Sequence, residues 1–197
     1  MKKIVLVTAF LFVCAGFLLA QGIPLADINL SSLEHQQKGM LVLGGWAVAN
    51  ILSGSIFAGK TEGAQRYFHQ MNIGWNAVNL GIAALGYYQA VTADPDTWSL
   101  AESIRRNYNL EKILLLNTGL DLAYMAGGFW MQEKAKSATE HPERLKGFGR
   151  SLVLQGAFLL VFDIANFAIH AADNKHFDEL LGQVRFNGNS ILFSMNF

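Results

Sequence analysis

The sequence contains four long apolar segments, and their length restricts the folds available to the chain. They span approximately Met40–Ala58, Met71–Val91, Ile113–Met131 and Ser151–Ala172. Each segment is close to the length of about 20 residues that an α-helix needs to cross a bilayer. The first two contain no Asp, Glu, Lys or Arg, whereas the outer faces of a soluble four-helix bundle would carry charged residues every few positions. The pattern therefore predicts an all-α, four-helix transmembrane bundle surrounded by the lipid bilayer.

The overall composition agrees with a membrane protein. Only 15% of the 197 residues are charged and 52% are hydrophobic, whereas about one quarter of the residues in an average soluble domain are charged. The formal net charge is zero and no basic patch is visible, which argues against a nucleic-acid partner.

The first twenty residues have the pattern of a secretory signal. Two lysines precede an apolar region from Ile4 to Leu19, and Ala20 stands at the expected cleavage point. Residues 1–20 are therefore predicted to be a signal peptide, with an uncleaved signal anchor as the alternative. Because Cys14 is the only cysteine and lies in this segment, the mature chain would have no disulfide, thiolate metal site or cysteine nucleophile.

The remaining chain is predicted to form a membrane domain over residues 21–182 and a periplasmic tail over residues 183–197. A capping-box pattern at Ser31–Glu34 predicts a helix start near Ser31. In the longest connection, Asp94–Pro95 predicts the start of a short amphipathic helix at the membrane interface.

Four spans with an exported amino end place both mature termini in the periplasm and predict a bacterial inner-membrane location. The third connection, residues 132–150, carries five Lys or Arg close to helix ends, as expected of a cytoplasmic loop. In the tail, Val184–Phe186 and Ser190–Phe197 flank an Asn-Gly-Asn sequence, and apolar residues alternate in the second stretch. This pattern predicts a hairpin-like end to the chain.

Each apolar segment carries polar side chains on one face. Asn50, Asn79, Asp121 and Asp163 each lie near the middle of their segment, so antiparallel helices would bring them into one layer. Further polar residues share faces with these four, and they are Asn117, Tyr124, Asn166 and His170.

The polar layer has two interpretations. In the first, it is structural, because Asn and Tyr in spanning helices form interhelical hydrogen bonds of about 0.6 kcal/mol each. In the second, it is functional, because no span contains a Lys or Arg to neutralise Asp121 and Asp163. Two carboxylates in a low dielectric cannot comfortably both ionise, so the pair shares a proton or holds a cation. This interpretation predicts a proton- or cation-coupled channel or transporter with His170 as an outer relay.

Other functions have little support in the sequence. The sequence has no nucleophile elbow, no zinc-protease pair and no phosphate-binding loop, so neither an enzyme nor a cofactor is predicted. No metal site is predicted, although His35, His170 and His176 could all approach the exported surface, where zinc or copper is the alternative. An envelope scaffold that presents the tail to a partner, and a homo-oligomer, both stay open.

The chain resembles small uncharacterised four-span membrane proteins of Gram-negative bacteria. The resemblance rests on Gly74–Ala83, Asp121–Tyr124 and the Phe-terminated tail, and it extends over most of the mature chain. It implies the same membrane architecture, but it carries no activity and no functional residues.

Overall fold

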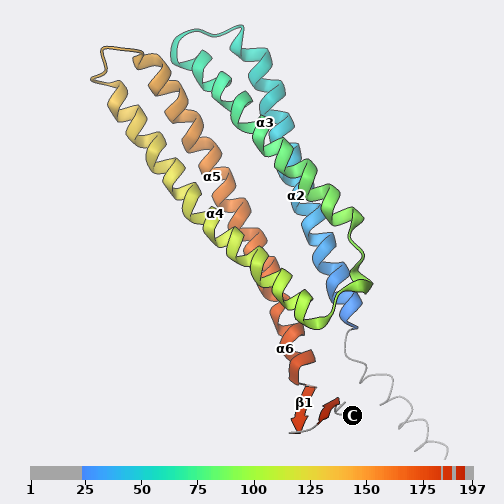
Figure 1. The fold of residues 1–197 in the computed structure, drawn as a ribbon. Coiled ribbons are helices and arrows are strands. Elements are labelled where there is room, and N and C mark those ends of the chain that lie inside the picture. The colour runs from blue at the N-terminus through green and yellow to red at the C-terminus, as the bar shows by residue number, and fades with distance from the viewer. Residues whose placement is uncertain (1–23, 183, 188–189, 194–197) are drawn as a thin grey trace, which may run out of the picture.

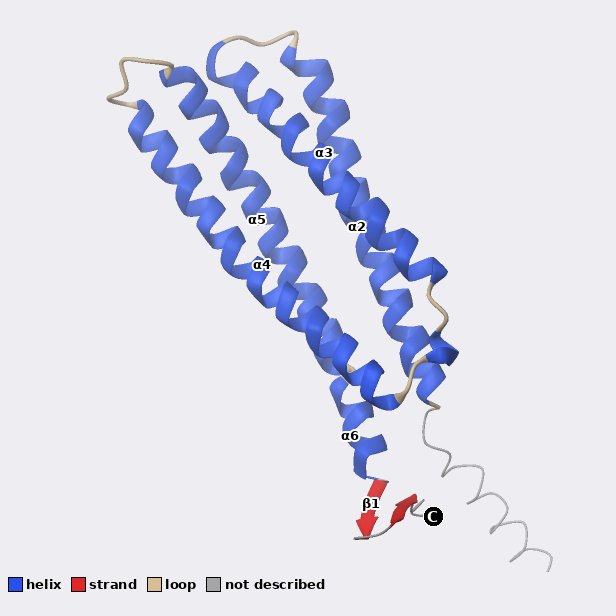
Figure 2. Cartoon of the chain, in the orientation of Figure 1, coloured by secondary structure: helices blue, strands red, loops and turns tan. Residues whose placement is uncertain are grey.

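The computed structural model describes residues 24–182, 184–187 and 190–193. The predicted signal peptide, with Cys14, lies outside the described residues, as do residues 188–189 and the last four residues. The described chain is almost entirely helical and has four long helices, which confirms the all-α, four-helix part of the prediction (Figure 2). The four long helices are α2 (Leu25–Ala58), α3 (Gly63–Thr92), α4 (Leu100–Ala135) and α5 (Pro142–Ala172).

The long helices form two antiparallel hairpins, α2 with α3 and α4 with α5, whose connecting loops lie at the same end of the molecule (Figure 1). Helix α3 also packs on α5 and joins the two hairpins into one bundle. The short helix α6 (Asn174–Gly182) continues from α5 at the opposite end. Beyond it, β1 (Val184–Asn187) pairs antiparallel with β2 (Ser190–Phe193), where the alternating pattern predicts a hairpin.

Helix α2 begins at Leu25, so the predicted start near Ser31 is wrong. Pro24 precedes the first turn, and its carbonyl accepts hydrogen bonds from the backbone N–H groups of Asp27 and Ile28. No Gly or Pro interrupts the next residues, so Ser31 lies within the helix. The early start has a consequence for packing, because the Asn29 side chain donates to the carbonyl of Pro95, 3.0 Å away.

The predicted interfacial helix after Asp94 does not exist as a separate element. Asp94 caps only the short 3₁₀ helix η1 (Pro95–Thr97) by accepting from the backbone N–H of Asp96. A capping box between Ser99 and Glu102 then starts α4, which runs without a Gly or Pro as far as residue 118. Hydrogen bonds from the Ser99 backbone and side chain hold the pKa of Glu102 below its ordinary value. The expected amphipathic turns are therefore the first turns of α4.

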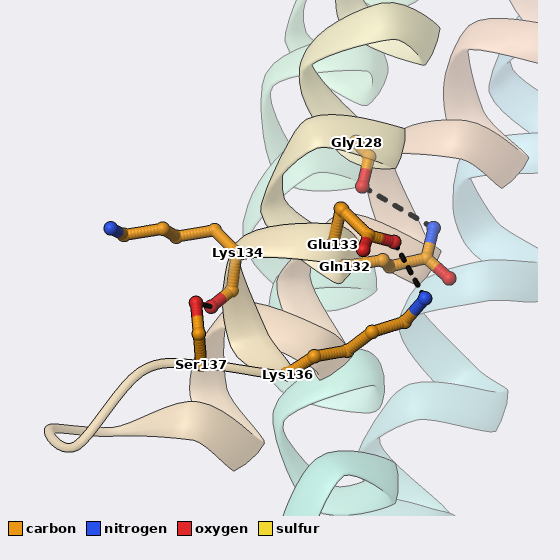
Figure 3. Close-up of polar contacts among 6 residues, drawn as sticks. All are labelled: Gly128, Gln132, Glu133, Lys134, Lys136 and Ser137. Atoms are coloured by element: carbon orange, nitrogen blue, oxygen red, sulfur yellow. Dashed lines mark hydrogen bonds and ion pairs between the residues drawn. The ribbon is translucent and has the colours of Figure 1, made fainter.

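The last turns of α4 satisfy their exposed polar groups locally (Figure 3). The Gln132 side chain donates to the carbonyl of Gly128 at 3.3 Å, and Lys136 pairs with Glu133 at 2.6 Å. Ser137 donates to the carbonyl of Lys134 just beyond the helix end. The turn into α5 follows at Pro142, a residue suited to a first helical position.

Two of the four predicted spans qualify as membrane helices by length and apolar composition. They are α2 and the segment Pro142–Gly182, which comprises α5 and α6. Helices α3 and α4 are long enough but less apolar, because their predicted spans contain three Asn residues in α3 and an Asn and an Asp in α4. The prediction of four spans is thus supported directly for two helices only.

The bundle has a polar interior and an apolar surface. Among the described residues, more of the buried side chains are polar or charged than apolar. Large apolar side chains on all four helices are instead exposed, including Leu41 of α2, Leu85 of α3, Leu116 of α4 and Val161 of α5, at 60–69%. This distribution is the reverse of the one found in soluble domains.

Helices α4 and α5 approach each other most closely at Gly128 and Gly149. A Cβ atom on Gly128 would lie 2.6 Å from the Gly149 carbonyl oxygen, and one on Gly149 would lie 2.5 Å from the Gly128 oxygen. Neither contact leaves room for a side chain, so backbone packs on backbone at this level. Small residues have this role at many interfaces between membrane helices.

We predict that Gly128→Leu destabilises the α4–α5 pair by about 1–3 kcal/mol, the range expected of overpacking. Gly127→Leu is the matched control, since a Cβ on Gly127 would meet nothing within 4 Å. Both variants gain the same helix propensity, so a difference between them reports the contact. Thermal unfolding in detergent, followed by circular dichroism, measures the effect, and equal midpoints for the two variants would contradict it.

Candidate functional site

One part of the interior is a hydrogen-bonded network that joins α2, α3 and α5. Gln155 lies at its centre, fully buried, and its side-chain oxygen accepts from the Trp46 indole at 2.9 Å. Its amide nitrogen donates to Asn50 at 3.3 Å and to Asn72 at 3.0 Å. The buried Ser151 hydroxyl also donates to Asn72, at 2.5 Å. Because these side chains satisfy one another, the network is sufficiently explained as a structural connection between helices.

A second part of the interior is a pair of carboxyl groups. Asp121 of α4 and Asp163 of α5 are 2% and 5% exposed, and both line the same cavity. Asn117 lines this cavity as well. Ionised carboxylates only accept hydrogen bonds, so two of them in contact can bond to each other only if they share a proton. The Oδ2 atom of Asp121 is buried and has no hydrogen-bond partner in the described part of the chain.

The carboxyl pair borders a cavity of about 360 Å³ between the two helical hairpins. All four long helices contribute to its wall, from Met40 and Leu43 of α2 to Leu159 and Phe162 of α5. Most lining side chains are apolar. Besides the two carboxyl groups, the polar lining residues are Asn79 and Asn117, and the aromatic ones are Trp75, Tyr124 and Phe162.

Trp75 and Tyr124 form an aromatic contact at the cavity wall. Their ring centroids are 4.8 Å apart and their planes meet at 80°, an edge-to-face arrangement. The indole N–H of Trp75 is buried and has no acceptor among residues whose positions are described. Two residues that line the cavity, Trp75 and Asp121, therefore each carry a buried polar atom without a hydrogen-bond partner among the described residues.

Five of the predicted site residues meet at this cavity: Asn79, Asn117, Asp121, Tyr124 and Asp163. Asn50 does not, so the predicted single layer of four polar residues is wrong. Helix α2 packs against α3 and α5, and Asn50 belongs to the network around Gln155 instead.

Asn166 also lies away from the carboxyl pair. Its amide bonds to the carbonyl of Phe162 on its own helix, and its side-chain oxygen faces Gly39 of α2, where an added Cβ would lie 2.7 Å away. It lines a separate groove, of about 360 Å³, between α2 and α5. Asn166 therefore does not connect the carboxyl pair to His170, the predicted outer relay.

His170 is 2% exposed and lies near the C-terminal end of α5. Its ring is 6.2 Å from that of His35, at 84°. The Nδ1 atoms of both, together with His176 Nδ1 and Asp173 Oδ2, are buried and without hydrogen-bond partners among the described residues. Burial raises the pKa of Asp173, which lies just beyond the expected span, although the neighbouring His35, His176 and Lys175 act to lower it.

This group of histidines does not form a metal site as the side chains stand, because no cluster of three or more His, Cys, Asp or Glu in the described chain has suitable geometry. Nearby, the Asn107 amide donates to Glu111 at 2.9 Å, to Asn174 at 2.8 Å and to the His170 carbonyl at 3.2 Å. These bonds connect α4 to α5 and α6.

Gln155 and the Asn107–Glu111 pair are not among the residues predicted from the sequence. Gln155 is a single amide within an otherwise apolar stretch of α5, and this isolation was the available signal. Asn107 and Glu111 stand four residues apart, which places them on one helix face. Their partners come from other helices, so their importance depends on the tertiary structure.

We predict that Gln155→Leu destabilises the bundle by about 2 kcal/mol, since three interhelical bonds of about 0.6 kcal/mol each are lost. Thr118→Val is the control, because Thr118 bonds only to the Leu114 carbonyl of its own helix. Denaturation by increasing SDS in mixed micelles, followed by circular dichroism, gives the two values. A loss for Thr118→Val as large as that for Gln155→Leu would show that the network has no special role.

Comparison with known proteins gives one family. DUF6992, described as a family of unknown function, matches residues 42–164, and this range includes both the Gln155 network and the carboxyl pair. No curated protein and no solved structure matches the chain. The match extends over more than half of the sequence, and the chain belongs to the DUF6992 family.

Proposed function

We propose that this protein is an integral membrane protein in which all four long helices cross the bilayer. The observation that carries the proposal is the apolar outer surface, which extends over α3 and α4 as well as over the two more apolar helices. Leu85 of α3 and Leu116 of α4 are 65% and 64% exposed, whereas Asn76 and Asp121 on the same helices are buried. The polar residues that reduce the hydropathy of α3 and α4 therefore face the interior, where lipid does not meet them.

The proposed location is a bacterial inner membrane with both mature termini in the periplasm. In this orientation the two hairpin loops face the cytoplasm, and α6 lies on the periplasmic side with the start of α2. The basic residues around the α4–α5 loop support this orientation.

We predict that a cysteine at Ser137, in the α4–α5 loop, reacts with a membrane-impermeant maleimide only after cell lysis. A cysteine at Asp178 of α6 should react in intact spheroplasts. Both positions are exposed, and Cys14 is replaced by alanine in each variant. The reverse labelling pattern would contradict the orientation, and extraction of the protein by alkaline carbonate would contradict membrane insertion.

Within this protein we propose that Asp121 and Asp163 form a site that binds a proton or a cation reversibly, as part of a channel or transporter. The support is the contrast between the two interior clusters. The Gln155 network is satisfied and explains how three helices are held together. The carboxyl pair lines a cavity and leaves Asp121 Oδ2 without a hydrogen-bond partner in the described chain, and a buried acceptor without a partner is costly. A purely structural role accounts for the network but not for the unused oxygen.

We predict that the protein in proteoliposomes supports a pH-dependent proton or cation flux that Asp163→Asn reduces to the level of protein-free liposomes. The substitution keeps the shape of the side chain but removes its ability to carry a negative charge. Asp178→Asn, on the exposed face of α6, should leave the flux unchanged. Absence of flux in the unmodified protein, or an unaltered flux in the Asp163 variant, would contradict the proposal. The buried polar residues would then have a structural role only.

A further inference from the structure

The cavity beside the carboxyl pair has the size of a small-molecule site. Its volume of about 360 Å³ lies within the range of about 300–1,000 Å³ typical of ligand pockets. One water molecule accounts for about 30 Å³ of the liquid, so a proton or a bare inorganic ion would occupy only a small part of this space. The rest would be water against leucine, isoleucine and valine side chains, or an apolar ligand.

The polar and aromatic groups of the wall supply a particular chemistry. Asp121 lines the cavity and is only 2% exposed, and its Oδ2 atom is a buried acceptor that has no hydrogen-bond partner among the described residues. The rings of Trp75 and Tyr124 line the same cavity. Carboxylates combined with aromatic rings are the groups that proteins use to bind organic ammonium ions, through charge and through cation–π attraction.

The charge of the pair limits the ligand further. Two carboxyl groups that share one proton carry one negative charge, and none of the described residues that line the cavity is a Lys, Arg or His. A single positive charge neutralises this pair, whereas an anion would add to its negative charge. A divalent metal ion would need the shared proton to leave and about six oxygen ligands, which the mostly apolar wall does not supply. The ligand that fits is therefore a monocation with an apolar body.

We propose that the cavity binds a small organic monocation, an amine or quaternary ammonium compound, with its charged nitrogen beside Asp121 and Asp163 and its apolar body among the side chains of α3 and α4. This inference rests on the proposed function of the carboxyl pair and names the class of ligand for it.

A second cavity lies toward the end of the bundle where α6 begins. Its volume is about 320 Å³, and its lining includes polar residues such as Asn29, Gln36 and Asn107. Leu110 and Ile113 line both cavities, so the two spaces are neighbours. Arg106, which also lines this second cavity, is held over the Trp98 ring, with 4.3 Å between the guanidinium carbon and the ring centroid.

The test uses the full chain in lipid nanodiscs and the probe 2-phenylethylammonium, with 2-phenylethanol as the neutral control of similar size and methylammonium as the cation without an apolar body. We expect saturable heat on titration with 2-phenylethylammonium, weaker binding of methylammonium, and no saturable binding of 2-phenylethanol. Binding should also change the tryptophan fluorescence. Trp75→Phe should remove this change, whereas Trp130→Phe, at an exposed position, should retain it.

Two variants separate the carboxyl pair from the space beside it. Asp163→Asn should abolish saturable binding of 2-phenylethylammonium, with circular dichroism as the check on folding. Ile82→Trp changes a half-exposed residue of the cavity wall and fills the space without altering a carboxyl group. It should weaken binding of 2-phenylethylammonium but leave that of methylammonium unchanged, so the proposal stays testable if the Asp163 variant does not fold.

The outcomes also separate this proposal from the one on which it rests. If proton or sodium flux depends on Asp163 but 2-phenylethylammonium neither binds nor inhibits the flux, the ligand class is wrong and the proposed function stands. If no flux and no binding are found, both fall. Equal binding to the unmodified protein and to Asp163→Asn would mean that the probe only partitions into the lipid, which overturns the inference.

Discussion

The structure depends on one constraint: polar side chains within long apolar helices must find their partners inside the bundle. An amide or carboxyl group that faced hydrocarbon would lose its hydrogen bonds without replacement. The chain meets this constraint by directing its Asn, Gln and Asp residues inward and its large apolar residues outward. Gln155 shows the result most clearly, because it bonds to side chains of both α2 and α3. The packing of three helices is thus specified by hydrogen bonds more than by an apolar core.

Close backbone contacts allow the carboxyl groups to meet. Gly128 and Gly149 bring α4 and α5 together near their loop, and Gly156 continues the contact toward the centre of the bundle. A Cβ atom on Gly156 would lie 2.9 Å from the carbonyl oxygen of Asp121. This contact holds the backbone of Asp121 against Gly156 of α5, which lies seven residues before Asp163. The close approach at Gly156 therefore positions the carboxyl groups of both α4 and α5. The glycine contacts and the carboxyl pair are therefore parts of one arrangement.

The two interior clusters differ in the way that distinguishes a structural element from a binding site. In the network around Gln155, buried groups are used by their neighbours, and a ligand would have to displace existing bonds. Around the carboxyl pair, an acceptor on Asp121 and a donor on Trp75 have no hydrogen-bond partner in the described part of the chain, and both residues line the cavity. A buried acceptor without a partner costs stability, and a cation bound beside Asp121 would recover part of that cost. Both clusters lie within the range shared with the DUF6992 family.

The sequence by itself determined the helical class, the four long elements and the polar face of each, because these follow from periodicity and from the length of apolar segments. It also identified Asp121, Asp163, Asn79, Asn117 and Tyr124 as residues that would come together. It did not determine that Asn50 and Asn166 face elsewhere, that Ser99 instead of Asp94 starts α4, or that Gln155 links three helices. Helical periodicity gives the direction of a side chain relative to its own axis only. The neighbour on that side, and the cavity left between two hairpins, depend on how closely the helices approach, which only the packed tertiary structure decides.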